Sequence, residues 1–197
     1  MHPLPFVYPY ALIFWPVYCL MFGQEYKIIA RHKSTAGGSQ GQDRGSYRLI
    51  MLCNGIGVAL AFVIAGTVSS ALILEWQQTL FWLGLVLMLA GMYLRRHCFK
   101  MLADNFKPAV TVVANQPVIE TGAYKWIRHP SYLAGIVMFE GVGAALANWI
   151  SMLVILVLSM VAYWYRIQVE EKALVETIGE PYKEYMKRTK RLVPFVF

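Results

Sequence analysis

Residues 49–74 read LIMLCNGIGVALAFVIAGTVSSALIL, an unbroken stretch without a charged residue. A helix that crosses the hydrocarbon core of a bilayer needs about 20 apolar residues, because each residue advances about 1.5 Å through about 30 Å. This stretch meets that requirement, and 58% of the 197 residues in the whole chain are hydrophobic. Such a composition is too apolar for a soluble domain of this size, so the sequence predicts an integral membrane protein.

Outward from that stretch, four further apolar segments predict membrane helices. Together the five predicted spans are Leu4–Phe22, Leu49–Leu74, Thr79–Leu94, Tyr132–Ala147 and Ile150–Tyr165. Only Asn148 and Trp149 separate the last two spans, which predicts a tight helical hairpin. The predicted fold class is therefore all-α, an integral membrane protein with about five transmembrane helices.

The first 23 residues resemble a secretory signal peptide in length and hydrophobicity. They lack a basic start and a small-x-small cleavage site, and they contain Pro3, Pro5, Pro9 and Pro16. We therefore expect this segment to remain in place as a first membrane helix with an irregular entry.

The 18 lysines and arginines all fall within three segments, at 27–48, 95–128 and 166–191. The other predicted exposed pieces, at the N-terminus, at Glu75–Gln78 and at Asn148–Trp149, contain none. The positive-inside rule then predicts an external N-terminus, with the three basic segments and the C-terminus in the cytosol. The net charge of +7 is explained by this orientation, and we expect no nucleic-acid partner.

The chain divides into two predicted regions. Residues 1–103 form an N-terminal three-helix membrane region with a basic cytosolic loop at 24–48, and residues 104–197 carry the groups suited to chemistry. The cysteines, Cys19, Cys53 and Cys98, show no CxxC spacing and are interpreted as packing residues. We expect no metal site.

Helical periodicity stops after the third predicted span. The segment from Phe106 to Pro130 contains a β-branched run at Val110–Val113, which favours extended structure, and residues 121–132 read TGAYKWIRHPSY. Aromatic and basic residues in this position are also typical interfacial anchors. Pro130, however, restricts the backbone next to His129 and thereby orients the imidazole at the N-terminus of a predicted helix. A long segment at the membrane surface is a common place for a ligand.

A second polar cluster, Arg166 with Glu170 and Glu171, follows the fifth predicted span. On a helix Arg166 and Glu170 share a face, and Glu171 is rotated onward by about 100°. This spacing fits an ordinary i,i+4 salt bridge. It also fits a cluster that lies at the same membrane depth as His129 and faces one cavity with it.

Three motifs follow one another around the predicted hairpin. They are Gly122-x-Tyr124-x-x-x-Arg128-His129-Pro130-x-Tyr132, Arg166-x-x-x-Glu170-Glu171-x-x-Leu174 and Gly179-x-x-Tyr182-x-x-Tyr185. In this pattern the chain resembles the isoprenylcysteine carboxyl methyltransferase family and its prokaryotic relatives, over about residues 104–197.

The resemblance implies a pocket for S-adenosylmethionine, built by the cytosolic loop and C-terminal helices, with a lipid-side tunnel for a hydrophobic substrate. The cofactor contacts that it implies are Val118, Gly122, Tyr124, His129, Tyr132, Glu170 and Glu171. Arg128 and Arg166 are the implied catalytic residues, which position the carboxylate of the substrate. Many relatives have a histidine where this chain has Gln116, so one cofactor contact differs.

The activity that the resemblance implies is O-methylation of the carboxylate of an isoprenylcysteine-like or other lipophilic substrate. Methyl transfer from a sulfonium is an in-line displacement that depends on positioning, without a metal ion or a nucleophilic side chain. A carboxylate with a pKa of about 3.3–3.7 is ionised at neutral pH and needs no general base. We expect Glu170 to contribute more to cofactor affinity than to the rate of the bound reaction.

Other functions remain open at this point. A phospholipid amine or small thiol must lose a proton, with Glu170 or His129 as candidate base. An NADPH-dependent membrane reductase of the sterol type shares the C-terminal architecture, and a non-catalytic scaffold needs no cofactor. Glu140, inside the fourth predicted span, has no place in the family pattern and suits either a polar contact between helices or a role in the tunnel.

Overall fold

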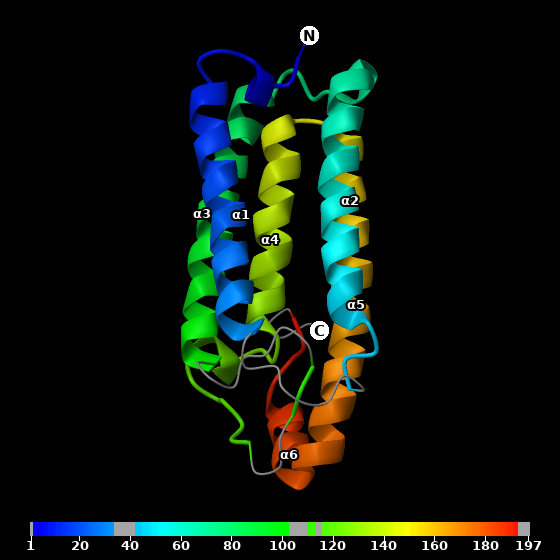
Figure 1. The fold of residues 1–197 in the computed structure, drawn as a ribbon. Coiled ribbons are helices and arrows are strands. Elements are labelled where there is room, and N and C mark those ends of the chain that lie inside the picture. The colour runs from blue at the N-terminus through cyan, green and yellow to red at the C-terminus, as the bar shows by residue number, and fades with distance from the viewer. Residues whose placement is uncertain (1, 34–41, 103–109, 113–115, 193–197) are drawn as a thin grey trace.

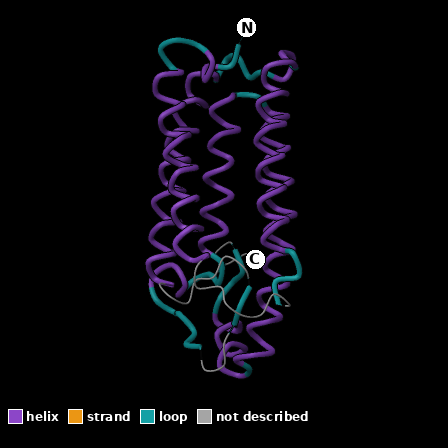
Figure 2. Tube along the Cα trace, in the orientation of Figure 1, coloured by secondary structure: helices purple, strands orange, loops and turns teal. Residues whose placement is uncertain are grey.

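The computed structural model describes residues 2–33, 42–102, 110–112 and 116–192. Within these ranges the α-helices are α1 (Ala11–Lys33), α2 (Ser46–Thr67), α3 (Gln77–Leu102), α4 (Pro130–Leu146), α5 (Trp149–Ile178) and α6 (Glu180–Arg188). Short 3-10 turns are η1 (Leu4–Phe6), η2 (Ser69–Ala71) and η4 (Gly122–Lys125). Figure 2 shows no strand in the described ranges, so the predicted all-α class is confirmed.

Helices α1 to α5 form an elongated bundle, and α6 lies beyond the end of the bundle that is remote from the N-terminus (Figure 1). Helices α2, α3 and α5 are long and apolar enough to cross a membrane, and α4 is a shorter apolar helix. Large apolar side chains such as Leu60, Val86 and Val161 remain exposed on the outside of the bundle. Such a surface is suited to lipid. For α1 and α4 the predicted membrane crossing stays a prediction.

The predicted bounds of the first span are wrong. The α-helix starts at Ala11, not at Leu4, because prolines in the first residues cannot donate the backbone hydrogen bonds of a continuous helix. It continues to Lys33, so residues 24–33, which the sequence analysis assigns to a loop, are helical.

Other helix ends also differ from the prediction. Helix α2 ends at Thr67, short of Leu74, and the Thr67 hydroxyl donates to a backbone carbonyl of its own last turn. Helices α3 and α5 continue to Leu102 and Ile178, beyond the predicted ends at Leu94 and Tyr165. Both helices extend past their apolar stretches into polar sequence. Val110–Val112 lie outside any helix, as predicted, while Val113 lies outside the described residues.

The predicted hairpin between α4 and α5 is confirmed, with Ala147 and Asn148 as its turn. The Asn148 side chain caps α5 by accepting a hydrogen bond from the Ser151 N–H (3.1 Å). It also donates to the Val68 carbonyl (3.1 Å), and the Ile73 N–H donates to the Ala147 carbonyl (2.8 Å). These bonds fix the turn against the connection between α2 and α3.

Glycines set the close approach of α3 to α4. A Cβ added at Gly84 would lie 2.5 Å from the Ala145 nitrogen and 2.5 Å from the Gly141 carbonyl oxygen. A Cβ at Gly91 would lie 2.7 Å from the Met138 Cβ. Gly84 and Gly91 therefore allow the backbones of α3 and α4 to pack closely.

Helix α2 packs on α5 with the help of buried hydrogen bonds. The Ser151 hydroxyl donates to the Ala61 carbonyl (2.8 Å), and the Ser159 hydroxyl donates to the Asn54 Oδ1 (3.0 Å). Bonds of this kind contribute about 0.6–2 kcal/mol each between membrane helices.

Glu140, in α4, has a buried Oε1 without a hydrogen bond to the described residues. It does not line either of the two cavities described below. Neither of the two roles expected for it is therefore supported.

The packing of α3 on α4 gives a matched test. A Cβ added at Gly55, on α2, meets nothing within 4 Å, so this glycine is not required for helix packing. We predict that Gly84→Ala destabilises the protein by about 1–3 kcal/mol, because the backbone of α4 must move, whereas Gly55→Ala does not. Thermal unfolding in detergent measures both variants, and equal melting temperatures would contradict the packing described.

Candidate functional site

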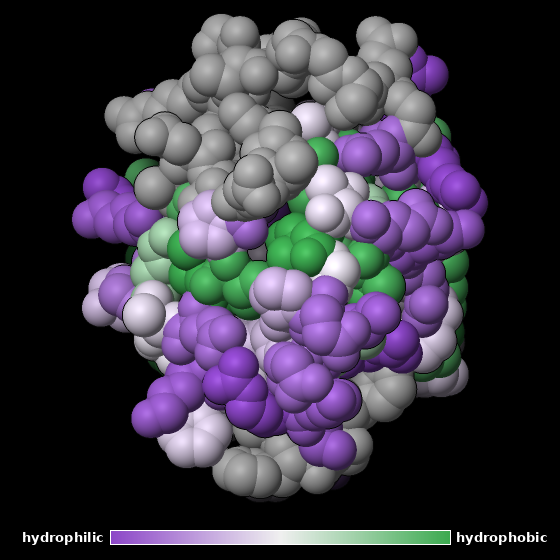
Figure 3. All heavy atoms as spheres, turned by 90° about the horizontal axis from the view of Figure 1, so that it is seen from below, coloured by the Kyte–Doolittle hydropathy of each residue, from purple (hydrophilic) through white to green (hydrophobic). Residues whose placement is uncertain are grey.

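The predicted polar residues meet at the end of the bundle next to α6. Seen from that end, hydrophilic side chains surround a smaller apolar area (Figure 3). A cavity that is open to solvent lies here, with about 860 Å³ of empty space. Its lining residues are Leu102, Val110, Thr111, Val112, Gln116, Pro117, Val118, Ile119, Tyr124, Arg128, His129, Ser131, Tyr132, Arg166, Glu170, Leu174, Ile178, Tyr182 and Tyr185.

Most of the predicted site residues line this cavity. They are Val118, Tyr124, Arg128, His129, Tyr132, Arg166 and Glu170. The structure thus brings residues of the Arg-His-Pro motif and of helix α5 to one cavity, as predicted. Gly122 and Glu171 lie outside the lining of this cavity.

Gly122 shapes the turn ahead of the cavity. Its φ of 58° lies in the left-handed region, which residues with a Cβ rarely adopt. An added Cβ would also collide with the Met101 side chain. The implied contact of Gly122 with the cofactor is not supported; the residue allows η4 to present Tyr124 to the cavity.

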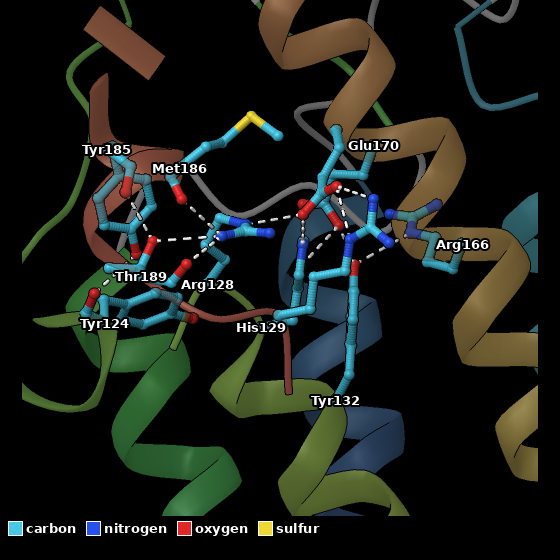
Figure 4. A network of polar contacts seen from close by, with 11 residues as sticks. Tyr124, Arg128, His129, Tyr132, Arg166, Glu170, Tyr185, Met186 and Thr189 are labelled. Atoms are coloured by element: carbon cyan, nitrogen blue, oxygen red, sulfur yellow. Dashed lines mark hydrogen bonds and ion pairs between the residues drawn. The ribbon is translucent and has the colours of Figure 1, made fainter. Parts of the chain in front are cut away.

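Three polar side chains meet on the wall of the cavity (Figure 4). The Tyr132 hydroxyl donates to Glu170 Oε2, and Arg166 Nε donates to the Tyr132 oxygen (3.1 Å). The His129 ring stacks on Tyr132, with 5.2 Å between centroids and 4° between planes, and its Nδ1 lies 3.7 Å from Glu170 Oε2. Pro130, the first residue of α4, fixes the chain at this point.

Glu171 lies behind this wall and is buried. Its Oε1 accepts from Arg128 Nε (2.8 Å) and lies 3.3 Å from His129 Nε2, while its Oε2 accepts from Arg191 Nε (3.0 Å). The predicted cofactor contact of Glu171 is therefore not supported. The reason is the helix period: one residue beyond Glu170, the side chain is rotated by about 100° away from the cavity.

Arg128 lines the cavity but is mainly bound to protein groups. Besides Glu171, it donates through Nη1 to the carbonyls of Met186 (3.2 Å) and Thr189 (2.5 Å). Its Nη2 makes no hydrogen bond to the described part of the chain. Only this one amino group remains to meet a ligand.

Arg166 is paired with Asp43, which precedes α2. Its Nη1 donates to Asp43 Oδ1 (2.5 Å) and to the Ser46 hydroxyl (2.9 Å). The Asp43 carboxylate also accepts from the N–H groups of Val110 (2.9 Å) and Tyr47 (3.2 Å). Burial raises the pKa of Asp43, but these backbone hydrogen bonds and the Arg166 charge outweigh it and leave the pKa below its ordinary value. Arg166 thus reaches the cavity with its charge already compensated.

Arg95, which the sequence analysis counts only as an orienting charge, is buried in an ion pair. Its Nε and Nη2 donate to the two oxygens of Glu25 (2.6 and 2.8 Å), and its Nη1 donates to the Ser131 carbonyl (2.8 Å). The pair joins α1 and α3 to the first turn of α4, directly beside the Arg-His-Pro motif.

Sequence reasoning missed Asp43 and Glu25. Asp43 stands just ahead of the apolar run of α2, a position where acidic residues favour a helix N-terminus, and this signal was available. Glu25 falls in a segment predicted as a loop, so no local signal indicates that it lies inside the bundle.

The C-terminal segment completes the site. The Arg128 N–H donates to the Lys190 carbonyl (2.7 Å), and the His129 N–H donates to the Arg191 carbonyl (3.0 Å). Because of this pairing, the Arg-His-Pro motif is held on one side by α5 and on the other by residues 190–191.

Tyr124 lines the cavity with a buried hydroxyl. Its carbonyl accepts from the Tyr185 hydroxyl (2.7 Å); Ser131 is placed to donate to the Tyr124 oxygen, but no described residue accepts a hydrogen bond from the Tyr124 O–H. Burial raises the pKa of Tyr124 well above its ordinary value, so the phenol remains protonated. Since buried polar groups are normally satisfied, this hydroxyl indicates a ligand.

The pairing of Arg166 with Asp43 has a pH signature. Because the Asp43 pKa is lower in the folded protein, its contribution to stability is present above an unfolded pKa of about 3.9 and is lost as the pH falls through the folded value. We predict that Asp43→Asn costs about 3–5 kcal/mol at pH 7, as expected when a buried ion pair loses one partner. The difference from the parent protein should shrink near pH 3.

Unfolding in detergent at both pH values measures this effect. Glu75→Gln, at an exposed position between α2 and α3, serves as the control for loss of one acidic group. If Asp43→Asn lowered the free energy of unfolding by the same amount at pH 7 and at pH 3, the ion pair between Asp43 and Arg166 would be contradicted.

Comparison with known sequences places this site in a family. The profile of the isoprenylcysteine carboxyl methyltransferase (ICMT) family matches residues 82–176, which include all of α4 and most of α3 and α5. Residues 82–176 of this chain are therefore similar to that family, in agreement with the motifs.

Individual relatives agree with this placement. The protein-S-isoprenylcysteine O-methyltransferase of Saccharomyces cerevisiae is 30% identical over 116 residues, which cover 58% of this chain and 48% of the yeast protein. The methanethiol S-methyltransferase of Pseudomonas deceptionensis is 34% identical over 122 residues, which cover 59% of this chain and 44% of that protein. The chain thus matches about half the length of these relatives.

The fold also has a counterpart among solved structures. The eukaryotic intramembrane Ras methyltransferase ICMT superposes with a TM-score of 0.63 at 21% identity, covering 91% of this chain and 64% of the other. The likeness supports a multi-pass integral membrane fold.

Proposed function

We propose that this protein is a membrane-embedded methyltransferase that uses S-adenosylmethionine and methylates a lipophilic acceptor. The observation that carries the proposal is the cavity in which the Arg-His-Pro motif, α5 and α6 meet around the Tyr124 hydroxyl, whose O–H has no acceptor among the described residues. The match to the ICMT family supports the same reaction. The predicted orientation would place this cavity on the cytosolic side of the membrane.

The lining of the cavity fits the cofactor. An apolar cluster formed by Val110, Val112 and the α5 residues Leu174 and Ile178 suits the flat adenine ring. The Glu170 carboxylate can accept hydrogen bonds from the amino or ribose hydroxyl groups of the cofactor. Tyrosine rings such as Tyr132 can face a positively charged sulfur as cation–π partners.

When bound, S-adenosylmethionine supplies an electrophilic methyl group on a sulfonium. The residues of the chain then have to hold the acceptor in line with that methyl group and keep water away. Tyr132 and Arg166 are suited to this task, because the hydrogen bonds from Arg166 to Tyr132 and from Tyr132 to Glu170 fix all three side chains in place.

A carboxylate oxygen is the acceptor group that we propose first. Such a group is already ionised and requires no base, and Arg128 has one amino group, Nη2, that can bind it. The yeast relative is named for O-methylation, which supports this choice.

A thiol is the second candidate, and the pairing of Arg166 with Asp43 favours it. With that charge compensated, the cavity has less positive charge for a carboxylate than the motifs alone suggest. A thiol must lose its proton, which the side chains of Glu170 and His129 are placed to accept. The Pseudomonas relative is named for S-methylation.

Binding of the cofactor is the first test. We predict that the purified protein in detergent binds S-adenosylmethionine but not NADPH, and that Glu170→Gln weakens the affinity about tenfold to a hundredfold, through loss of a charge-assisted hydrogen bond. Isothermal titration calorimetry measures both. The rate at saturating cofactor should change less than the affinity.

Glu176→Gln is the matched control. Glu176 lies on the same helix, is exposed and pairs only with Lys172 in the described structure, so its neutralisation should leave cofactor affinity unchanged. If the protein bound NADPH, or neither compound, the proposed function would be wrong.

The acceptor group is tested with a panel comprising a farnesylated cysteine analogue, a phospholipid amine and a small thiol. We predict methyl transfer to the carboxylate of the cysteine analogue, at a rate that varies little between pH 6 and about 8, since the carboxylate is ionised throughout. Transfer of radiolabelled methyl is the measurement. Transfer to the thiol alone, rising toward its pKa of about 8.5, would instead establish the second candidate.

A further inference from the structure

A second cavity, with about 450 Å³ of empty space that includes open solvent, lies among α1, α2, α3, α4 and α5. Its apolar lining includes Ile28, Ile50, Met51 and Phe99. Met51 is 40% exposed, so this apolar wall reaches the outer surface of the bundle. None of these four residues belongs to the motifs that define the family resemblance.

The second cavity adjoins the cofactor cavity. Tyr132 and Arg166 line both, so these two side chains form the partition between them. A molecule in the second cavity can therefore present one end to the partition, where the polar wall of the first cavity begins, while its remainder lies among apolar side chains.

The charged groups around the second cavity are compensated within the protein. Arg95 is bound by both oxygens of Glu25, and Arg166 is bound by Asp43. An ionic group lying deep in this cavity would have to displace one of these buried partners. The cavity consequently suits an uncharged ligand segment.

Tyr163 adds an unsatisfied polar group to this lining. It is 1% exposed, and its ring stacks on Tyr132 with 5.2 Å between centroids. The Asn54 side chain is placed to donate a hydrogen bond to the Tyr163 oxygen, but no described group accepts a hydrogen bond from the Tyr163 O–H. Gly135 provides the room for this hydroxyl, because a Cβ at that position would collide with it.

We propose that the second cavity binds the methyl acceptor and that Tyr163 is a specificity-determining residue, whose hydroxyl donates to an uncharged carbonyl oxygen of the acceptor. This carbonyl belongs to an amide or ester that links the reacting group to a single apolar chain. The reacting group lies at the partition formed by Tyr132 and Arg166, the carbonyl at Tyr163, and the chain along Ile50 and Met51. The inference rests on the proposed function and deepens it by naming the acceptor class.

Two matched pairs of acceptors test this assignment. N-decanoylglycine and tridecanoic acid have equal chain length and the same carboxylate, but only the first has an amide. N-decanoylcysteamine and tridecanethiol form the corresponding thiol pair. For the pair that the enzyme methylates, we expect kcat/KM to be about tenfold or more higher for the amide member, because the other leaves the Tyr163 hydroxyl unsatisfied.

Tyr163→Phe should remove this preference. It lowers kcat/KM for the amide member about tenfold, leaves the plain-chain member within about a factor of two, and does not change the affinity for S-adenosylmethionine. Tyr93→Phe, an exposed tyrosine on α3 that lines neither cavity, is the control and should change nothing. The melting temperature of Tyr163→Phe should fall little, since no described group accepts a hydrogen bond from the lost hydroxyl.

A binding measurement separates this inference from the proposed function. Calorimetric titration with N-decanoylglycine and with tridecanoic acid needs no turnover, and the first should bind more tightly to the parent protein but not to Tyr163→Phe. If the parent protein bound both compounds with equal affinity, or if Tyr163→Phe lowered the affinity for both equally, the inference would be overturned. Absence of S-adenosylmethionine binding would instead overturn the proposed function.

Discussion

The buried carboxylate of Glu171 organises the polar end of this protein. It lies between Arg128, His129 and Arg191, which come from the loop before α4 and from the C-terminal segment. Charges in such a place are strongly unfavourable unless they are paired, so this carboxylate stabilises all three groups in their positions. Its effect on the site is indirect, since it holds the residues that form the cavity wall and does not itself line the cavity.

The same constraint governs the other segments around the cavity. Asp43 ties the start of α2 and the backbone of Val110 to Arg166, and Glu25 ties α1 to Arg95 and to the first turn of α4. In each case one carboxylate satisfies an arginine at the polar end of apolar helices. The two cavities lie between these pairs and share Tyr132 and Arg166 as their common wall.

The sequence predicts those features that depend on local pattern. The α4–α5 hairpin follows from two apolar runs, and the meeting of His129 with Glu170 follows from motifs on either side of that hairpin. The partners Glu25 and Asp43 lie 70 and 123 residues from their arginines along the chain, so no local pattern reveals them. Likewise, the choice between Glu170 and Glu171 depends on how α5 is rotated about its own axis, which only packing decides.

The pairing of residues 128–129 with residues 190–191 bears on how the protein is made. Helices α1 to α5 precede that C-terminal segment in the chain, so they leave the ribosome before Arg191 is available to meet Glu171. During that interval the Arg-His-Pro motif lacks one of its two supports. Biogenesis therefore has an order, in which the helices are made first and the C-terminal segment closes the cavity afterwards.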